Sequence, residues 1–168
     1  MENKMSIAEL TLRSEEIRKR LLEEVYKAKA GHIGGDLSSL NVLTALYLRI
    51  MNVDPANPKM EGRDRFVMSK GHCVEALYCV LEAKGFIKRE LVDTYGDYLS
   101  PLAGHPTVEV PGIEFNSGAL GHGLSIGVGC ALAAKMDGKS YKTYVLMGDG
   151  EQGEGSIYEA AMAGSNYG

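Results

Sequence analysis

Two short apolar runs, each followed at once by a polar cluster that contains glycine, constrain the fold most strongly. The first run, RFVMS at 65–69, leads into KGH at 70–72, and the second, at 141–147, leads into GDG at 148–150. Both runs lie between helical patterns, as expected for strands of a parallel sheet that helices cover on both faces. Because ligands gather at the carboxyl ends of such strands, we expect both polar clusters to lie at a binding site.

Helical periodicity predicts the other elements of a single α/β domain, residues 1–168, in which helices sandwich a parallel sheet. The expected helices cover residues 10–29 with an end at Gly31, 36 or 38 to 51, 73–84 with an end at Gly85, 87–95, 120–136 and 156–165. Asp36 and Ser38 are the candidate N-caps of the second helix. Residues 96–118, rich in proline and glycine, predict an irregular loop, and a loop of that length is usually functional or disordered.

Composition excludes several classes of protein. The net charge of −4 argues against a nucleic-acid-binding protein, which normally presents a basic face. No apolar stretch approaches the roughly 18 residues that a membrane span needs, and the first residues lack the apolar core of a signal peptide. Cys73, Cys79 and Cys130 have no metal-like spacing and fall in apolar helical patterns. We therefore expect reduced, buried thiols in a cytoplasmic protein.

The four histidines, His32, His72, His105 and His122, each follow a glycine. Each Gly-His pair falls at the boundary of an element or in the long loop. One such pair can simply end a helix or fill a turn. Four of them favour a functional interpretation, because glycine lets a ligand or backbone approach and imidazole exchanges protons near neutral pH.

Asp149 stands between two glycines at the end of the second strand. Aspartate is favoured in turns and at helix N-caps, so a structural role is one interpretation. A metal ligand is the other, since Mg²⁺ prefers one or two protein oxygens together with phosphate oxygens and water. The flanking glycines would let a diphosphate approach the backbone near the start of the next helix.

The segment SGALGHGLSIGVG, residues 117–129, is a second glycine-rich entry into a helix. It matches neither a Walker loop nor the dinucleotide-binding fingerprint. Gly123, Gly127 and Gly129 would let the helix pack closely on the sheet. Gly118 and Gly121 precede the helix, so helix packing explains them less well.

Five motifs in this order resemble the N-terminal, diphosphate-binding part of transketolase, particularly the kind made as two separate subunits. The motifs are GHIGGDLS (31–38), SKGH (69–72), LAGHP (102–106), SGALGHGLS (117–125) and GDGEQGEGS (148–156). The resemblance covers nearly the whole chain. It implies the thiamine diphosphate-binding fold, with this chain as an incomplete diphosphate-binding domain.

The resemblance also implies thiamine diphosphate held through Mg²⁺, and reversible transfer of a two-carbon ketol unit between sugar phosphates in the pentose phosphate pathway. Asp149 would be the metal ligand. The residues implied to bind the cofactor are His72, Gly118, Leu120, Gly148, Asp149 and Gly150. Those implied to be catalytic are His32, His72, His105 and Glu154, the last at a subunit interface.

This sequence departs from the family pattern at several places. His122 stands where transketolases commonly carry glutamine, and Ala119 replaces a residue that is often proline or serine. The chain ends at Gly168, before the asparagine that completes the family's metal site, and it lacks the pyrimidine-binding domain. We therefore expect a C-terminally truncated half-site that is inactive without a C-terminal, pyrimidine-binding partner subunit. The resemblance implies a homodimer or heterotetramer.

Rival interpretations stay open at this point. A 1-deoxy-D-xylulose-5-phosphate synthase shares the first Gly-His motif and Gly-Asp-Gly, although SKGH and LAGHP fit transketolase better. A relative that acts on modified or sulfonated sugars is harder to exclude, and an inactive α/β scaffold or interaction module is the alternative outside enzymes. A plain nucleotide-binding domain lacks the acidic residue of a ribose-binding fingerprint.

Overall fold

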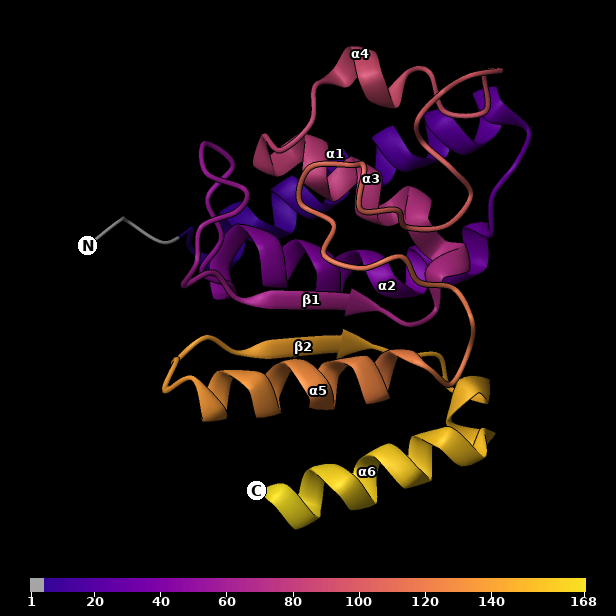
Figure 1. Ribbon diagram of the computed structural model, residues 1–168. Coiled ribbons are helices and arrows are strands. Elements are labelled where there is room, and N and C mark those ends of the chain that lie inside the picture. The colour runs from indigo at the N-terminus through magenta and orange to yellow at the C-terminus, as the bar shows by residue number, and fades with distance from the viewer. Residues whose placement is uncertain (1–4) are drawn as a thin grey trace.

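A two-stranded parallel sheet lies at the centre of the molecule (Figure 1). The computed structural model describes residues 5–168. The first four residues, on which the prediction of no signal peptide partly depends, lie outside the described residues. Strand β1 (Arg65–Met68) pairs with β2 (Thr143–Leu146), and Met68 lies opposite Leu146. Both predicted strands are confirmed, and the parallel register brings their carboxyl ends to one edge.

Helices cover the sheet in layers, as predicted. Four helices lie on the β1 side of the sheet, α5 packs against both strands and α6 lies against α5 on the far side (Figure 1). The helices are α1 (Ile7–Ala28), α2 (Ile33–Ala45), α3 (Val74–Lys84), α4 (Arg89–Val92), α5 (Gly123–Met136) and α6 (Gly155–Tyr167). Short turns extend them: a π-helical turn over Leu46–Ile50, and 3-10 turns over Gly71–Cys73 and Gly150–Gly153. The loop predicted at residues 96–118 contains no helix or strand.

The ends of the first helices differ from the prediction. Helix α1 ends at Ala28 with Lys29 in the left-handed conformation (φ +51°), so the expected end at Gly31 is two residues late. Helix α2 begins at Ile33, before the predicted caps Asp36 and Ser38. Asp36 does not cap its own helix: its carboxylate accepts a hydrogen bond from the Ala76 backbone, in the first turn of α3, at 3.0 Å. A tertiary contact has overridden the local capping preference.

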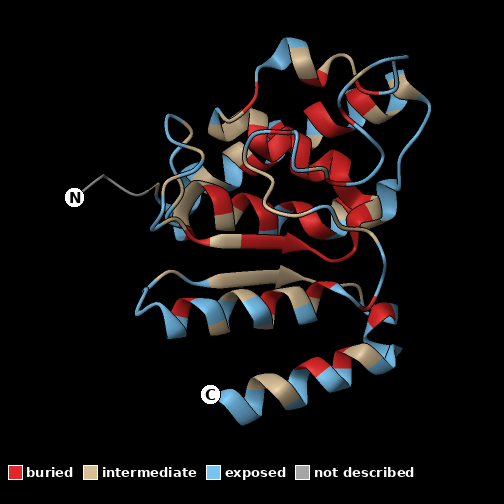
Figure 2. Cartoon of the chain, viewed as in Figure 1, coloured by how far each residue is buried: buried red, intermediate tan, exposed pale blue. Residues whose placement is uncertain are grey.

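The core lies between β1 and the four helices that cover it. Helix α3 is buried along most of its length, as Figure 2 shows, and Tyr47 packs edge-on against Phe66 with ring centroids 5.6 Å apart. Cys73 and Cys79 are buried free thiols as expected, whereas the free Cys130 is only half-buried. No helix within residues 5–168 is both long and apolar enough to cross a membrane.

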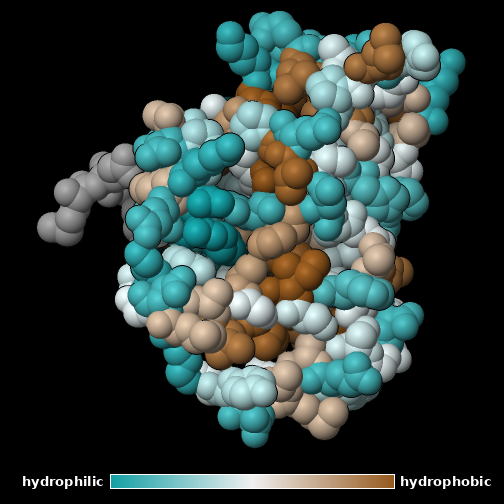
Figure 3. All heavy atoms as spheres, viewed as in Figure 1, coloured by the Kyte–Doolittle hydropathy of each residue, from teal (hydrophilic) through white to brown (hydrophobic). Residues whose placement is uncertain are grey.

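The α5 side of the sheet is more open. All four residues of β2 are half-buried, and α6 buries only Ile157 and Ala160. Gly127 packs on the sheet as predicted, since a Cβ atom there would overlap the Val145 side chain, but Gly129 has no neighbour within 4 Å of such an atom. The packing role predicted for Gly129 is therefore wrong. On the face in Figure 3, apolar side chains form separate patches divided by polar ones.

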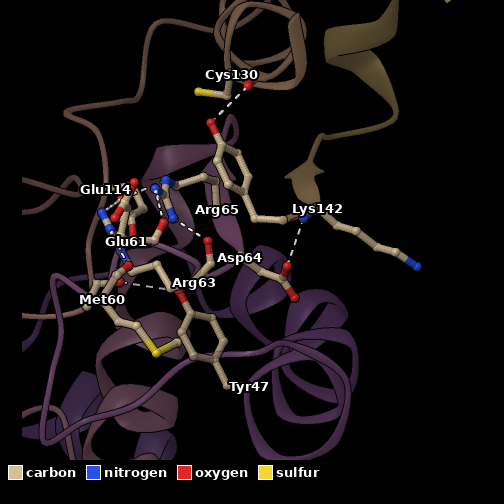
Figure 4. Close-up of polar contacts among 11 residues, drawn as sticks. Tyr47, Met60, Glu61, Arg63, Asp64, Arg65, Glu114, Cys130 and Lys142 are labelled. Carbon is tan, nitrogen blue, oxygen red and sulfur yellow. Dashed lines mark hydrogen bonds and ion pairs between the residues drawn. The ribbon is translucent and has the colours of Figure 1, made fainter. Parts of the chain in front are cut away.

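The amino ends of the strands are closed by polar contacts. Asp64 accepts hydrogen bonds from the Lys142 and Asn52 backbones, both at 2.8 Å. Arg63 donates through Nε to Glu114 at 2.6 Å, which fastens the long loop beside the start of β1 (Figure 4). The candidate site lies at the opposite edge of the sheet, where the carboxyl ends of both strands meet.

Candidate functional site

The two polar clusters meet where the strands end. The Ser69 backbone donates to the Leu146 carbonyl at 2.9 Å, so the chain after β1 stays paired to β2 for one more residue. Residues 70–72 and 148–150 then leave the sheet at the same edge. The predicted placement of both clusters at the carboxyl edge is confirmed.

A third turn, residues 117–123, joins this edge. A Cβ atom on Gly71 would lie 2.8 Å from the Gly118 Cα, so the two backbones are in direct contact. Ser117 donates through Oγ to the Met68 carbonyl at 2.7 Å. Gly118 has φ +135° and Gly121 has φ +84°, conformations that residues with a side chain rarely adopt. The backbone conformation therefore requires glycine at these two positions before the helix, where helix packing alone did not explain it.

Three of the four histidines gather at this edge. The His32 and His72 rings lie edge to face with centroids 5.0 Å apart. His105 packs on the third turn, since a Cβ atom on Gly118 would overlap its ring at Cδ2. His122 is exposed, and its Nδ1 lies 3.0 Å from the Leu120 carbonyl oxygen of its own turn. The predicted set of His32, His72 and His105 therefore has neighbouring positions, from three separate segments of the chain.

His72 has the most perturbed environment of the three imidazoles. Partial burial lowers its pKa, and the neighbouring His32, Lys70 and His105 lower it further, against a smaller opposing effect of Glu151. Lowering favours the neutral ring near pH 7. A neutral imidazole can accept a proton from a hydroxyl group, the role that a catalytic base needs.

The Asp149 carboxylate is exposed and makes no capping hydrogen bond to the 3-10 turn that follows it. Of the two structural roles considered, the turn residue is confirmed, because the Asp149 carbonyl accepts from the Gln152 backbone at 3.2 Å, and the side-chain N-cap is wrong. The carboxylate itself has no structural role in that turn. Within residues 5–168, no three His, Cys, Asp or Glu side chains are grouped so as to hold a metal ion. A divalent ion at Asp149 would need further oxygens from the backbone, a diphosphate or water, the donor set that Mg²⁺ accepts.

Leu120 lies in the third turn, and Glu154 lies beside it. Leu120 is 43% exposed, and Glu154 is exposed directly before α6. A Cβ atom on Gly121 would lie 2.8 Å from the Glu154 Cβ, and Ser156 donates through Oγ to the Gly121 carbonyl at 2.7 Å. Both predicted residues therefore border the same edge as Asp149.

Sequence reasoning missed Ser69, Lys70 and Glu151 as individual site residues. All three are buried polar residues within quoted motifs, but a motif does not reveal which polar side chain turns inward. Lys70, only 8% exposed, donates through Nζ to the Gly35 carbonyl at 3.2 Å and to Ser38 Oγ at 3.1 Å. It brings a positive charge to the cluster, a feature that suits an anionic ligand.

The family model for the transketolase thiamine diphosphate binding domain matches residues 11–167. The chain belongs to the transketolase family. This match places the three gathered imidazoles and Asp149 in a domain type defined by binding of thiamine diphosphate.

Individual transketolases agree with this assignment. The chain is 74% identical to one subunit of the apulose-4-phosphate transketolase of Phocaeicola vulgatus, over 97% of this chain and 58% of that subunit. It is 48% identical to one subunit of the 6-deoxy-6-sulfo-D-fructose transketolase of a Clostridium species, over 87% of this chain and 54% of that subunit. The chain thus spans less than two thirds of the length of these relatives.

A solved structure confirms the fold. The transketolase of Campylobacter jejuni superposes with a TM-score of 0.87 at 34% identity, covering 93% of this chain and 26% of that one. The predicted thiamine diphosphate-binding α/β fold is therefore correct.

Proposed function

We propose that this chain forms the diphosphate-binding part of a two-subunit transketolase, which transfers a two-carbon ketol unit reversibly between ketose and aldose phosphates. The proposal depends on one observation: His32, His72 and His105 gather at the sheet edge that also carries Asp149. Residues 1–168 would act as a single diphosphate-binding domain. A C-terminal, pyrimidine-binding subunit would complete the site in a cytoplasmic homodimer or heterotetramer.

The residues at the edge fit thiamine diphosphate and Mg²⁺. Asp149 offers an exposed carboxylate without a capping role. A Cβ atom on Gly150 would have no neighbour within 4 Å, which leaves room for phosphate oxygens, and Gly148 would bind the cofactor beside it. Gly118, Leu120 and His72 border the same space and would contact the cofactor. Lys70 adds a buried positive charge nearby. The chemistry of these donors is that of a metal–diphosphate site.

Bound thiamine diphosphate supplies the carbon nucleophile for ketol transfer. The chain's own residues would handle protons. His72, whose pKa is lowered, is suited to accept a proton from a substrate hydroxyl, and His32 beside it can hold or return one. His105, which packs on the third turn, would orient the substrate, and Glu154 would act from the subunit interface. Such positioned groups typically contribute about 10²-fold or more each.

Apulose 4-phosphate is the substrate that we propose first. The support is the 74% identity to a subunit named for that sugar phosphate, against 48% for the subunit named for 6-deoxy-6-sulfo-D-fructose. Assays with each compound and the partner subunit would separate these two specificities. Activity with neither compound would remove this substrate assignment.

Calorimetric titration with thiamine diphosphate and Mg²⁺, with and without the partner subunit, tests the function itself. We expect binding in the complex, no ketol transfer by this chain alone, and loss of binding by at least roughly tenfold in Asp149→Asn. Asp137→Asn, at the exposed residue directly after α5, is the matched control. Absence of binding with and without the partner would instead favour an inactive scaffold.

A further inference from the structure

Glu151 is a buried acid at the centre of the candidate site. Its side chain lies directly after the Gly-Asp-Gly turn, and the residue is only 4% exposed. Oε1 accepts a hydrogen bond from the Gly121 backbone at 2.8 Å and another from the Ser69 hydroxyl. Oε2 accepts from the Gly148 backbone at 2.9 Å. One carboxylate therefore joins three segments that are far apart in the sequence.

Each of these segments carries residues of the site. Ser69 directly precedes residues 70–72, which include His72. Gly121 lies in the third turn, which also contains Gly118, and Gly148 directly precedes Asp149. Moving any of the three donors would therefore move a residue that we assign to cofactor binding.

Ser69 extends the network by one step. Its hydroxyl donates to Glu151 and accepts a hydrogen bond from the Gly123 backbone at 3.0 Å, at the first residue of α5. A Cβ atom on Gly123 would overlap the Ser69 side chain. The start of α5 is thus fixed both by this bond and by the close approach that glycine permits.

We propose that Glu151 is a positioning residue, whose carboxylate holds the turns at 69–72, 117–123 and 148–150 together before any cofactor binds. The identity of the ligand rests on the function proposed above, but the claim that Glu151 holds the three turns in place does not. Glu151 touches no reacting atom in this proposal. It acts through Gly148 and Gly121 on the positions of Asp149 and Gly118.

Glu151→Gln tests the proposal because it keeps the size of the side chain and removes its capacity to accept on both sides. The amide nitrogen must face either the Gly148 N–H or the pair formed by Gly121 N–H and Ser69, so a donor meets a donor. Glu159→Gln, on an exposed position of α6, is the matched control.

Two readouts separate a positioning role from a merely structural one. In the cofactor-free chain labelled with ¹⁵N, Glu151→Gln should speed amide exchange at Gly121 or Gly148 by at least roughly tenfold more than at α3. In the complex with the partner subunit, it should raise the Kd for thiamine diphosphate with Mg²⁺ by at least roughly tenfold, while far-ultraviolet circular dichroism stays unchanged. The control should change neither quantity.

The proposal is overturned if exchange at both glycines and the Kd stay within about twofold of the wild type. If Glu151→Gln does not fold, Ser69→Ala replaces it, with faster exchange at Gly121 and Gly123 as the supporting result and unchanged exchange as the contrary one. If the wild-type complex binds no thiamine diphosphate, the proposed function fails. The exchange measurement then still decides the role of Glu151.

Discussion

Glu151 and the pair formed by Asp36 and Glu75 are all buried acids, but their carboxylate oxygens face different chemical groups. The oxygens of Glu151 face two backbone N–H groups and one hydroxyl group. Asp36, fully buried on α2, and Glu75, 3% exposed on α3, instead face each other. Within the described residues, Asp36 Oδ2 and Glu75 Oε2 are buried without a hydrogen-bond donor. Glu151 and the Asp36–Glu75 pair are thus buried to a similar extent, but they differ in the number of hydrogen-bond donors that face their oxygens.

The surroundings of the Asp36–Glu75 pair indicate a shared proton. Asp36 Oδ1 accepts from the Ala76 backbone, and Glu75 accepts from the Tyr95 hydroxyl. Burial and the charge of Glu75 raise the pKa of Asp36 to about 7, although the hydrogen bond from the Ala76 backbone and, to a smaller extent, Lys70 lower it in part. The comparison teaches that depth of burial does not determine how many hydrogen-bond donors a buried carboxyl group finds.

Ser69→Ala should have the largest effect on stability. It leaves Glu151 with fewer hydrogen-bond donors, as in the Asp36–Glu75 pair. The Gly123 N–H loses its acceptor and Glu151 loses a donor, at a combined cost of about 2–4 kcal/mol in the free energy of unfolding. Chemical denaturation measures this loss. Ser39→Ala is the control: that buried hydroxyl donates only to the Gly35 carbonyl of its own helix, and its loss should cost about 1 kcal/mol. Equal losses would contradict the assigned importance of Ser69.

Asp36→Asn should come next, with an effect that depends on pH. The folded-state pKa of Asp36 is raised, so the folded protein binds more protons than the unfolded chain between about pH 4 and pH 7. Wild-type stability therefore contains a part that falls as pH rises through this window, by at most about 1.4 kcal/mol per pH unit. Asparagine removes it, so the variant should gain stability relative to wild type from pH 4 to 7.

Denaturation curves at pH 4, 5.5, 7 and 8 would measure the difference between Asp36→Asn and wild type. We expect that difference to level off above pH 7. Asp97→Asn, an exposed acid in the long loop, provides a control whose difference should stay flat. A flat difference for Asp36→Asn as well would mean that the two buried acids share no proton.

Tyr95→Phe should have the smallest effect. It removes the hydroxyl that donates to Glu75, at a cost of about 1 kcal/mol at pH 5. The cost should rise at pH 8, where the pair has lost its shared proton and needs the donor more. Tyr98→Phe, at a residue 93% exposed, should change stability at neither pH. Thermal unfolding at both pH values tests this, and a cost independent of pH would count against the shared proton.

Local patterns predicted the elements and the location of the site. The apolar runs before Lys70 and Gly148 are strands, and Gly85 ends α3 in the left-handed conformation, as expected of a glycine after a helix. The Gly-His pairs identified three histidines that meet. These features depend on neighbours in the sequence, so a single sequence can reveal them.

The contacts that sequence did not predict are long-range. Asp36 looked like a cap, but its partner Ala76 is 40 residues away on another helix. Glu151 looked like one acid among several, and its donors come from turns up to 82 residues away. Gly129 belongs to a glycine series in which only some members face the sheet. No local periodicity encodes which distant group will meet such a side chain.

The loop that carries His105 is closed at its base. The Ser117 backbone donates to the Pro106 carbonyl at 3.3 Å, and the Ser117 hydroxyl bonds to Met68 in the sheet. The intervening stretch, residues 107–116, is therefore an excursion whose two ends are already joined. Val110 in this stretch is buried in the core, and Glu114 bonds to Arg63 beside the start of β1. The stretch therefore connects the end of the sheet that carries the imidazoles to the opposite end, so that a change in its length would disturb both ends at once.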